Sequence, residues 1–282
     1  MSDRMKNEDL LEVALEAARA GGSVLSDLLR RERKIAYKGK GRANLVTDAD
    51  HASEKAILEV LQRRVPKHRV LAEESGEKQS ESDYVWFVDP LDGTTNYAHG
   101  VPHFSVTLAV EGPAEDGTRQ VLAGVVRDPV RGEVFAAARG QGATLDGEKI
   151  QVSDTTTLDR ALLCTGFPYD LPTNWVAPLG LFNTIVKQAQ GMRRMGSAAL
   201  DISYLACGRF DGFWEFNLRP WDYAAATLLV QEAGGKVGRV DGGPFHVRVG
   251  HVLCSCPGLW DTLAKQSKEF LTSVNYSYEK GR

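Results

Sequence analysis

The stretch WFVDPLDGTTNY, residues 86–97, decides the fold and the chemistry of this chain more than any other part of it. It begins as a buried strand over 84–88, and two carboxylates, Asp89 and Asp92, follow at the carboxyl end of that strand. A glycine and two threonines come next, where a helix can begin. Acids beside an open helix N-terminus are the ingredients of a site for hard cations next to a phosphate group. A capping role would explain Asp92 alone and leaves Asp89 without a structural reason.

The composition is that of an ordinary globular protein. The 282 residues can bury a sizeable core, and 43% of them are hydrophobic and 25% charged. A net charge of −3 argues against a generally basic surface that coats nucleic acid. We expect neither a signal peptide nor a membrane span, since the first residues are polar and no apolar run approaches ~20 residues. The four cysteines lack zinc spacing, which indicates reduced, buried thiols and a cytoplasmic protein.

The hydrophobic pattern predicts mixed α/β architecture. For the first half we expect helices over 10–29 and 48–64, strands over 69–72, 84–88 and 104–110, and a hairpin that joins 120–127 to 132–137. For the second half we expect strands over 162–165, 192–195, 212–216 and 249–255, alternating with helices over 177–190, 197–207 (capped by Ser197), 220–233 and 259–271.

The chain divides near residue 155, where strands and helices begin to alternate. We expect an α+β half, 1–155, that carries most of the acids, and an α/β half, 156–282, that carries Asp222; the halves should pack as one unit. The segment 30–42 holds seven Lys or Arg residues and one Glu and is expected to be a mobile loop.

Acidic side chains stand at the ends of several predicted elements. They are Asp50, Glu73, Glu74, Asp89, Asp92 and Asp222. If these side chains converge, their charges need neutralisation, and few basic residues lie near them in the sequence. Mg²⁺ or Mn²⁺, about two or three ions, would supply it, because hard cations prefer oxygen ligands. Each acid taken alone is explained more simply as a helix cap or a solvated side chain; only the set points to a metal centre.

Longer segments carry a family resemblance. NLVTDAD, AEESG, DPLDGTTNY and WDYAAA resemble, in this order, the signature segments of the inositol monophosphatase family; they span 44–50, 72–76, 89–97 and 221–226. GSAA at 196–199 and DGFWE at 211–215 are similar to segments on its substrate side. The resemblance implies a layered αβαβα sandwich of the inositol monophosphatase and fructose bisphosphatase type. It also implies a Mg²⁺-dependent, lithium-sensitive phosphomonoesterase.

The resemblance assigns metal ligands. Glu73, Asp89 and the carbonyl oxygen of Leu91 would hold one ion. Asp89, Asp92 and Asp222 would hold a second, and Glu73 would contribute to a third. A family lysine expected before 46–47 falls on Lys38 or Lys40, and both assignments stay open. WDYAAA ends in Ala226 where the family more often has glycine, a change of packing rather than of chemistry.

The resemblance also assigns catalytic and substrate residues. Thr94, oriented by Asp50, would act with Glu73 to position and deprotonate the attacking water. Backbone N–H groups at the helix start would bind the phosphate; they belong to Gly93, Thr94 and Thr95. Asp92 and Asp222 would border the substrate, and the pocket would be lined by Gly196, Ser197, Ala198 and Glu215. Glu215 would accept a hydrogen bond from a substrate hydroxyl.

The expected reaction is hydrolysis of inositol monophosphate, or of a similar small polyol phosphate, by metal-activated water. Histidinol phosphatase and fructose bisphosphatase activities stay open as alternatives, and Thr95-Asn96 disfavours a bisphosphate nucleotidase. The resemblance implies a homodimer. An alternative of another class is a transcription antitermination factor that binds RNA polymerase, as some bacterial relatives do. Only the basic segment 30–42 suggests nucleic acid, and Tyr37 is its one aromatic residue, so we expect a solvated loop there.

Overall fold

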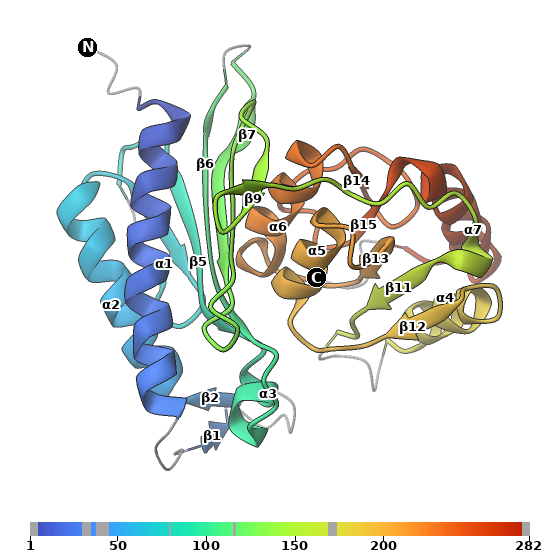
Figure 1. The fold of residues 1–282 in the computed structure, drawn as a ribbon, viewed down its shortest axis with the longest axis horizontal. Helices are drawn as coiled ribbons and strands as arrows, with labels where there is room; N and C mark the ends of the chain where they lie inside the picture. Colours follow the sequence, from blue (N-terminus) through green and yellow to red (C-terminus); the bar gives the residue numbers. More distant parts are fainter. Residues whose placement is uncertain are drawn as a thin grey trace.

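The computed structural model describes residues 5–29, 35–37, 45–78, 80–114, 117–168 and 174–277. Within this part of the chain, helices and sheets alternate in layers: a helix pair, a large sheet, a second helix pair, a smaller sheet and a third helix pair (Figure 1). The layered αβαβα arrangement that the family resemblance implies is therefore present. Among the helices of these residues, none combines the length and apolarity that crossing a bilayer requires.

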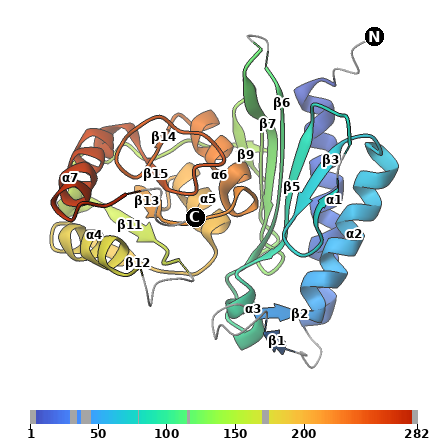
Figure 2. The same cartoon turned by 180° about the vertical axis from the view of Figure 1, so that it is seen from behind.

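The large sheet has eight strands in the order β10-β9-β8-β7-β6-β5-β3-β4. Its strands are β3 (Arg69–Ala72), β4 (Gly76–Lys78), β5 (Val85–Asp92), β6 (Ser105–Pro113), β7 (Arg119–Arg127), β8 (Val134–Ala138), β9 (Ala143–Leu145) and β10 (Glu148–Lys149). Two helices, α1 (Asn7–Leu29) and α2 (Asp48–Arg64), pack together on one face of it (Figure 2). The buried side of α1 is formed mostly by small and aliphatic residues, which lets the helix approach the sheet closely.

The smaller sheet has five strands in the order β12-β11-β13-β15-β14. Its strands are β11 (Leu162–Thr165), β12 (Gly191–Arg193), β13 (Gly212–Glu215), β14 (Lys236–Gly238) and β15 (Val252–Ser255). The outer helices are α4 (Val176–Val186) and α7 (Trp260–Ser273), and the helices between the two sheets are α5 (Ala198–Ala206) and α6 (Pro220–Glu232) (Figure 1). A short helix, α3 (Thr94–His99), lies beside the strand pair β1 (Ile35–Tyr37) and β2 (Leu45–Thr47) at one end of the large sheet.

Helix α6 is buried on nearly every side, as a helix between two sheets must be. Residues 223–230 are all buried, and the helix contacts β6, β7 and β8. Gly124 of β7 allows this contact, since a Cβ there would lie 2.8 Å from the Cα of Ala225. Because Asp222 lies in the first turn of α6, this packing also fixes Asp222 relative to the large sheet.

The carboxyl end of β5 contains a β-bulge. Asp89 pairs with Thr107 and Asp92 pairs with Ser105, so three steps along β5 match two steps along β6. The two residues inside the bulge are Pro90 and Leu91, and a proline, which has no N–H to donate, is tolerated at such a place. The bulge therefore keeps both acids on a strand that is paired on either side.

Most predicted elements are present, but several boundaries are wrong. β5 runs on to Asp92 instead of ending at 88, because the bulge lets pairing with β6 continue. The helix predicted over 177–190 ends at Val186, since the chain turns there and brings the N–H of Gln190 within 3.0 Å of the carbonyl of Leu158. The strand predicted over 249–255 begins only at Val252.

The predicted loop 30–42 is wrong in part. Residues 35–37 form β1, which pairs antiparallel with β2, and the sequence Ile-Ala-Tyr is apolar enough for a short strand between basic flanks. The other residues of that segment, Lys38 and Lys40 among them, lie outside the described residues.

The contact at Gly124 gives a stability prediction. Gly124→Ala should lower the free energy of unfolding by about 1–3 kcal/mol, because the added methyl meets helix backbone that cannot move aside. Urea denaturation followed by circular dichroism measures this change. The control is Gly22→Ala in α1, where the new methyl meets only the flexible side chain of Arg127 and helix propensity improves. An equal loss in both variants would contradict the account of α6 packing.

Candidate functional site

Four acidic side chains from three separate parts of the fold meet where α6 contacts β5. Glu73 follows β3, Asp89 and Asp92 lie on β5, and Asp222 lies on α6. Burial raises the pKa of Asp89 well above its usual range, and the charges of Glu73, Asp92 and Asp222 raise it further. Burial also raises the pKa of Asp222, with the charges of Glu73 and Asp92 adding to the shift. The acids predicted to converge are therefore close enough to repel one another.

Protein hydrogen bonds hold only one oxygen of each of the three aspartates, as far as the described residues show. Asp89 Oδ1 accepts the N–H of Leu91 at 2.9 Å. Asp222 Oδ2 accepts the N–H of Arg219 at 2.7 Å. Asp92 Oδ2 accepts the hydroxyl of Ser197 at 2.6 Å and the N–H of Ala199 at 2.8 Å. The donors are neutral, and in the described part of the chain no Lys, Arg or His forms an ion pair with these aspartates.

The donor set fits a hard cation. It consists of carboxylate oxygens without a thiol or an imidazole, which suits Mg²⁺ or Mn²⁺ and not zinc. Within the described residues no three His, Cys, Asp or Glu side chains already stand in positions that would hold an ion. The fit therefore rests on the chemistry of the donors and on their mutual repulsion, which a divalent cation would relieve.

Asp92 has a structural task that the sequence did not reveal. Ser197 was predicted to cap α5, but its side chain makes no capping hydrogen bond. The cap comes from Asp92, whose carboxylate accepts the N–H of Ala199 in the first turn of α5 and the hydroxyl of Ser197. Burial raises the pKa of Asp92 to about 6, although these two hydrogen bonds act in the opposite direction. The carboxylate of β5 thus ties the large sheet to the inner helix layer.

Asp50 and Thr94 are in contact. The hydroxyl of Thr94 lies 3.2 Å from Asp50 Oδ1 and 3.1 Å from the carbonyl oxygen of Leu91, and its single proton can serve one of them at a time. Asp50 is held by the capping box of α2, in which it accepts the N–H of Thr47 at 2.7 Å and its hydroxyl at 2.6 Å. Burial raises the pKa of Asp50, while the hydrogen bonds from Thr47 lower it.

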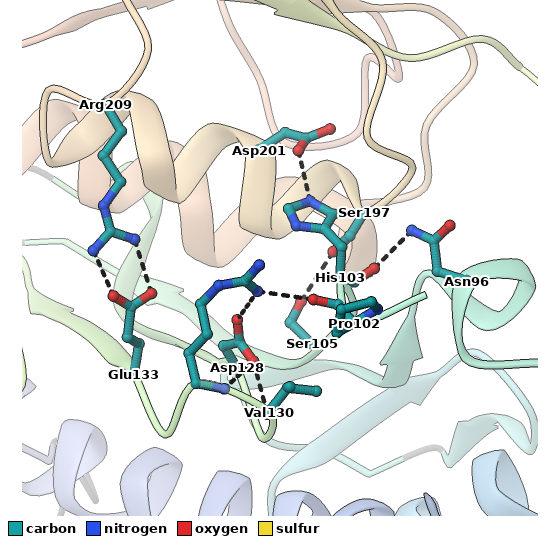
Figure 3. Close-up of polar contacts among 11 residues, drawn as sticks. Asn96, Pro102, His103, Ser105, Asp128, Val130, Glu133, Ser197, Asp201 and Arg209 are labelled. Atoms are coloured by element: carbon teal, nitrogen blue, oxygen red, sulfur yellow. Dashed lines mark hydrogen bonds and ion pairs between the residues drawn. The ribbon is translucent and has the colours of Figure 1, made fainter. Parts of the chain in front are cut away.

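The turn before α3 leaves no space for a side chain at residue 93. Gly93 has φ 97°, and a Cβ there would lie 3.2 Å from the carbonyl oxygens of Gly196 and His103. The amide of Asn96 donates to the carbonyl of His103 at 2.7 Å (Figure 3). It also donates to the carbonyl of Met195 at 2.8 Å. The candidate phosphate-binding N–H groups are thus held between segments of both halves. Thr95, at the start of α3, is exposed.

Glu215 lies at the end of β13 and faces the acid cluster. It is buried, and burial raises the pKa of Glu215 well above its usual range; the charge of Arg194 lowers it and that of Asp222 raises it. Its carboxylate packs directly on Gly166, where a Cβ would lie 2.0 Å from Oε2. Any other residue at 166 would therefore displace Glu215.

Some residues of the site carried no recognisable sequence signal. Ser53 donates to the carbonyl of Pro90 at 2.9 Å, inside the bulge. Glu54 accepts the backbone N–H of Glu74 at 3.0 Å. His103 and Asp201 form a buried pair at 2.8 Å. Their partners lie far away in sequence, so local patterns could not have identified them.

The acid cluster gives a prediction about pH. The pKa of Asp92 is about 6 in the folded protein and about 3.9 in an unfolded chain, so the folded state binds more protons between these values. Stability from this group is therefore lost as pH rises through about 6. With EDTA present, the melting temperature should fall between pH 5 and 7.5, and Mg²⁺ should reduce the fall. Differential scanning fluorimetry measures the melting temperature at each pH. The same fall in Asp92→Asn would show that the pH dependence does not come from the Asp92 carboxylate.

Comparison with known proteins agrees with the signature segments. The sequence profile of the inositol monophosphatase family matches residues 6–272. Nus factor SuhB of Pseudomonas aeruginosa is 43% identical over 253 residues, which cover 87% of this chain and 91% of that protein. The chloroplastic phosphatase IMPL1 of Arabidopsis thaliana is 44% identical over 250 residues, which cover 87% of this chain and 66% of that protein.

The solved structures agree in fold as well. An inositol monophosphatase from Anabaena shares 40% identity and superposes with a TM-score of 0.79, over 93% of this chain and 96% of that one. The match extends across both sheets and all three helix layers, which confirms the predicted fold class. By sequence and by fold, this chain belongs to the inositol monophosphatase family.

Proposed function

We propose that this protein is a Mg²⁺-dependent phosphomonoesterase that hydrolyses inositol monophosphate or a similar small polyol phosphate. The observation that carries the proposal is the convergence of Glu73, Asp89, Asp92 and Asp222 beside the glycine turn that opens α3. Membership of the family supports a phosphatase, and the family is generally metal-dependent. An acid cluster next to a row of backbone N–H groups can hold cations and a phosphate side by side.

The ligands are proposed as the resemblance assigns them. Glu73, Asp89 and the carbonyl of Leu91 would hold one ion. Asp89, Asp92 and Asp222 would hold a second, and Glu73 would also serve a third, weaker one. Bound Mg²⁺ would supply Lewis acidity and neutralise the charge that develops on the phosphoryl oxygens. The contact between Thr94 and Leu91 suits this arrangement, because rotation of the hydroxyl toward Asp50 would free the carbonyl.

The protein's own groups would guide the proton and the phosphate. Thr94 would accept a hydrogen bond from the attacking water and pass its own proton toward Asp50, which the cap of α2 holds in place. Glu73 would share the task of base. The N–H groups of 93–95 would bind the phosphate, and the close approach to Gly196 would exclude water from one side of the turn.

Glu215 would select the alcohol side of the substrate. A buried carboxylate with a raised pKa suits a substrate hydroxyl, with which it can exchange a hydrogen bond in either protonation state. Histidinol phosphate carries an ammonium group, and the charge of Arg194, which acts on the same carboxylate, would disfavour it. The phosphate ester of an uncharged polyol therefore fits beside Glu215 better than the ester of an alcohol that carries an ammonium group. Gly196, Ser197 and Ala198 would complete the pocket.

A second candidate function comes from relatives named Nus factor SuhB, one of which, from Pseudomonas aeruginosa, is 43% identical to this chain. A role in transcription would need a surface for polymerase or RNA. Of the basic segment 30–42, the structure describes only β1, and no described contact of β1 favours this role over the phosphatase. With the enzymatic function we also propose that the protein is a homodimer, with one active site in each subunit, and that it is cytoplasmic. The division into halves 1–155 and 156–282 is proposed as well.

A phosphate-release panel tests the proposal. The substrates are inositol monophosphate, histidinol phosphate, fructose bisphosphate, glycerol phosphate and a nucleoside bisphosphate, each with Mg²⁺, EDTA or Mg²⁺ plus millimolar lithium. We expect fastest release from inositol monophosphate or another small polyol phosphate, none in EDTA, and inhibition by lithium. Fastest release from histidinol phosphate would reassign the substrate, and no release from any substrate would overturn the proposal.

Removal of one ligand charge tests the metal assignment. Asp92→Asn should abolish turnover without unfolding the protein, because the amide oxygen can still cap α5 while the anionic ligand is lost. Phosphate release and circular dichroism measure the two effects. The matched control is Asp241→Asn, which removes a carboxylate paired with Arg239 in the loop after β14 and should keep full activity. Near-normal turnover in Asp92→Asn would contradict the assignment of Asp92 as a metal ligand.

A further inference from the structure

We propose that His103 and Asp201 form a positioning pair for the metal and phosphate site, acting through the first turn of α5. The inference rests on the proposed function and adds two residues to it. In the described part of the chain, neither side chain forms a hydrogen bond with a member of the acid cluster. Asp201 is linked through the first turn of α5 to the donors that hold Asp92. His103 is linked through its carbonyl to Asn96 in α3, just after the turn at Gly93, and the pair joins the two halves of the chain.

The pair itself is deeply buried. His103 Nε2 lies 2.8 Å from Asp201 Oδ1, and the two side chains are 3% and 2% exposed. His103 Nδ1 is buried and has no hydrogen-bond partner among the described residues. A proton on Nδ1 would therefore be buried without an acceptor, so Nε2 carries the ring proton and donates to Asp201. Tyr204 packs edge-on against the imidazole, with ring centroids 5.8 Å apart, and fixes its plane.

One route from the pair leads to Asp92. Asp201 lies in the first turn of α5, and its N–H donates to the carbonyl of Ser197 at 2.9 Å. Ser197 and Ala199, in the same turn, are the two donors that hold Asp92 Oδ2. The hydroxyl of Ser197 also lies 3.3 Å from that of Ser105, two residues after His103 (Figure 3). Fixing the position of Asp201 therefore also fixes Ser197 and Ala199, the two donors that orient the carboxylate of Asp92.

The other route leads to the phosphate turn. The carbonyl of His103 accepts the amide of Asn96 and lies against the space where a Cβ of Gly93 would stand. The side chain of His103, held by Asp201, sets where this carbonyl lies. A histidine free to move would loosen Asn96 and, with it, the N–H groups that begin α3. The pair thus restrains both the carboxylate of Asp92 and the turn at Gly93.

A second ion pair on the same helix layer provides a comparison. Glu133, before β8, pairs with Arg209, just after α5, and Figure 3 shows this pair at the opposite end of the helix from Asp201. It also joins the two halves of the chain, but its arginine is 38% exposed and none of its hydrogen bonds leads to Asp92 or Gly93. Arg209 also lies over the ring of Tyr204, 4.6 Å from its centroid, so the variant for comparison removes Glu133 and keeps the arginine. That variant separates a role in positioning the site from a role in holding the halves together.

The test is calorimetric titration of the full chain with Mg²⁺, together with Mg²⁺ activation of phosphate release. Asp201→Ala should raise the dissociation constant for Mg²⁺ and the half-activating Mg²⁺ concentration by ~10-fold or more, the usual effect of losing a partner that orients a metal ligand. Asp201→Asn retains a carbonyl oxygen for the proton on Nε2 and should recover most of the affinity. Glu133→Ala should stay within about twofold of the unaltered protein.

The outcomes separate the two proposals. If the unaltered chain binds Mg²⁺ and Asp201→Ala binds it equally well, the pair is structural only and this inference fails while the proposed function stands. If the unaltered chain binds no Mg²⁺, both fail. Partial unfolding lowers the measured stoichiometry and leaves the dissociation constant unchanged. Should Asp201→Ala not fold, Asp201→Ser replaces it, since the shorter hydroxyl cannot reach His103, and the same two results decide.

Discussion

Mutual repulsion among Glu73, Asp89, Asp92 and Asp222 is the constraint that the rest of this structure has to satisfy. Three of these groups have a pKa raised by burial, and for Asp89 and Asp222 the neighbouring acids raise it further. A flexible chain would separate such groups. Here β5 is paired on both sides and α6 is enclosed between two sheets, so neither element can move away. The core therefore holds the acids in an arrangement that only protons or cations relieve.

Different layers of the fold supply different parts of the site around this cluster. The bulge in β5 keeps Asp89 and Asp92 on one strand, and the glycine turn that follows places backbone N–H groups next to them. The helices between the sheets supply the remaining parts: α6 carries Asp222, and the first turn of α5 holds Asp92 through Ser197 and Ala199. The carboxylates that would bind cations and the N–H groups that would bind the phosphate thus come from different parts of the layered fold. They meet at one end of the large sheet, which explains why the two sheets must be packed together.

Residues 86–97 allowed the acid cluster and the turn to be predicted, because strand, paired acids and glycine are local features of the sequence. The family segments supplied Asp222 and Glu215. The contacts that orient these groups could not be predicted. Asp92 meets Ser197 across 105 positions, and His103 meets Asp201 across 98, and no periodicity encodes such distances. Ser197 was misassigned as a cap for the same reason, since Asp92 reaches that helix end from another strand. The basic composition of 30–42 led to the prediction of a loop, although residues 35–37 within it form a short strand.

The most direct test of the central claim is a proton count during Mg²⁺ binding. Calorimetric titration at pH 6 in buffers of different ionisation enthalpy measures the protons released per ion bound. If crowded carboxylates are neutralised by protons until a cation replaces them, binding must release protons at this pH, which lies close to the raised pKa of Asp92, about 6. Release of protons together with binding is the predicted result. Binding whose enthalpy is the same in every buffer, or no binding at all, would contradict the account.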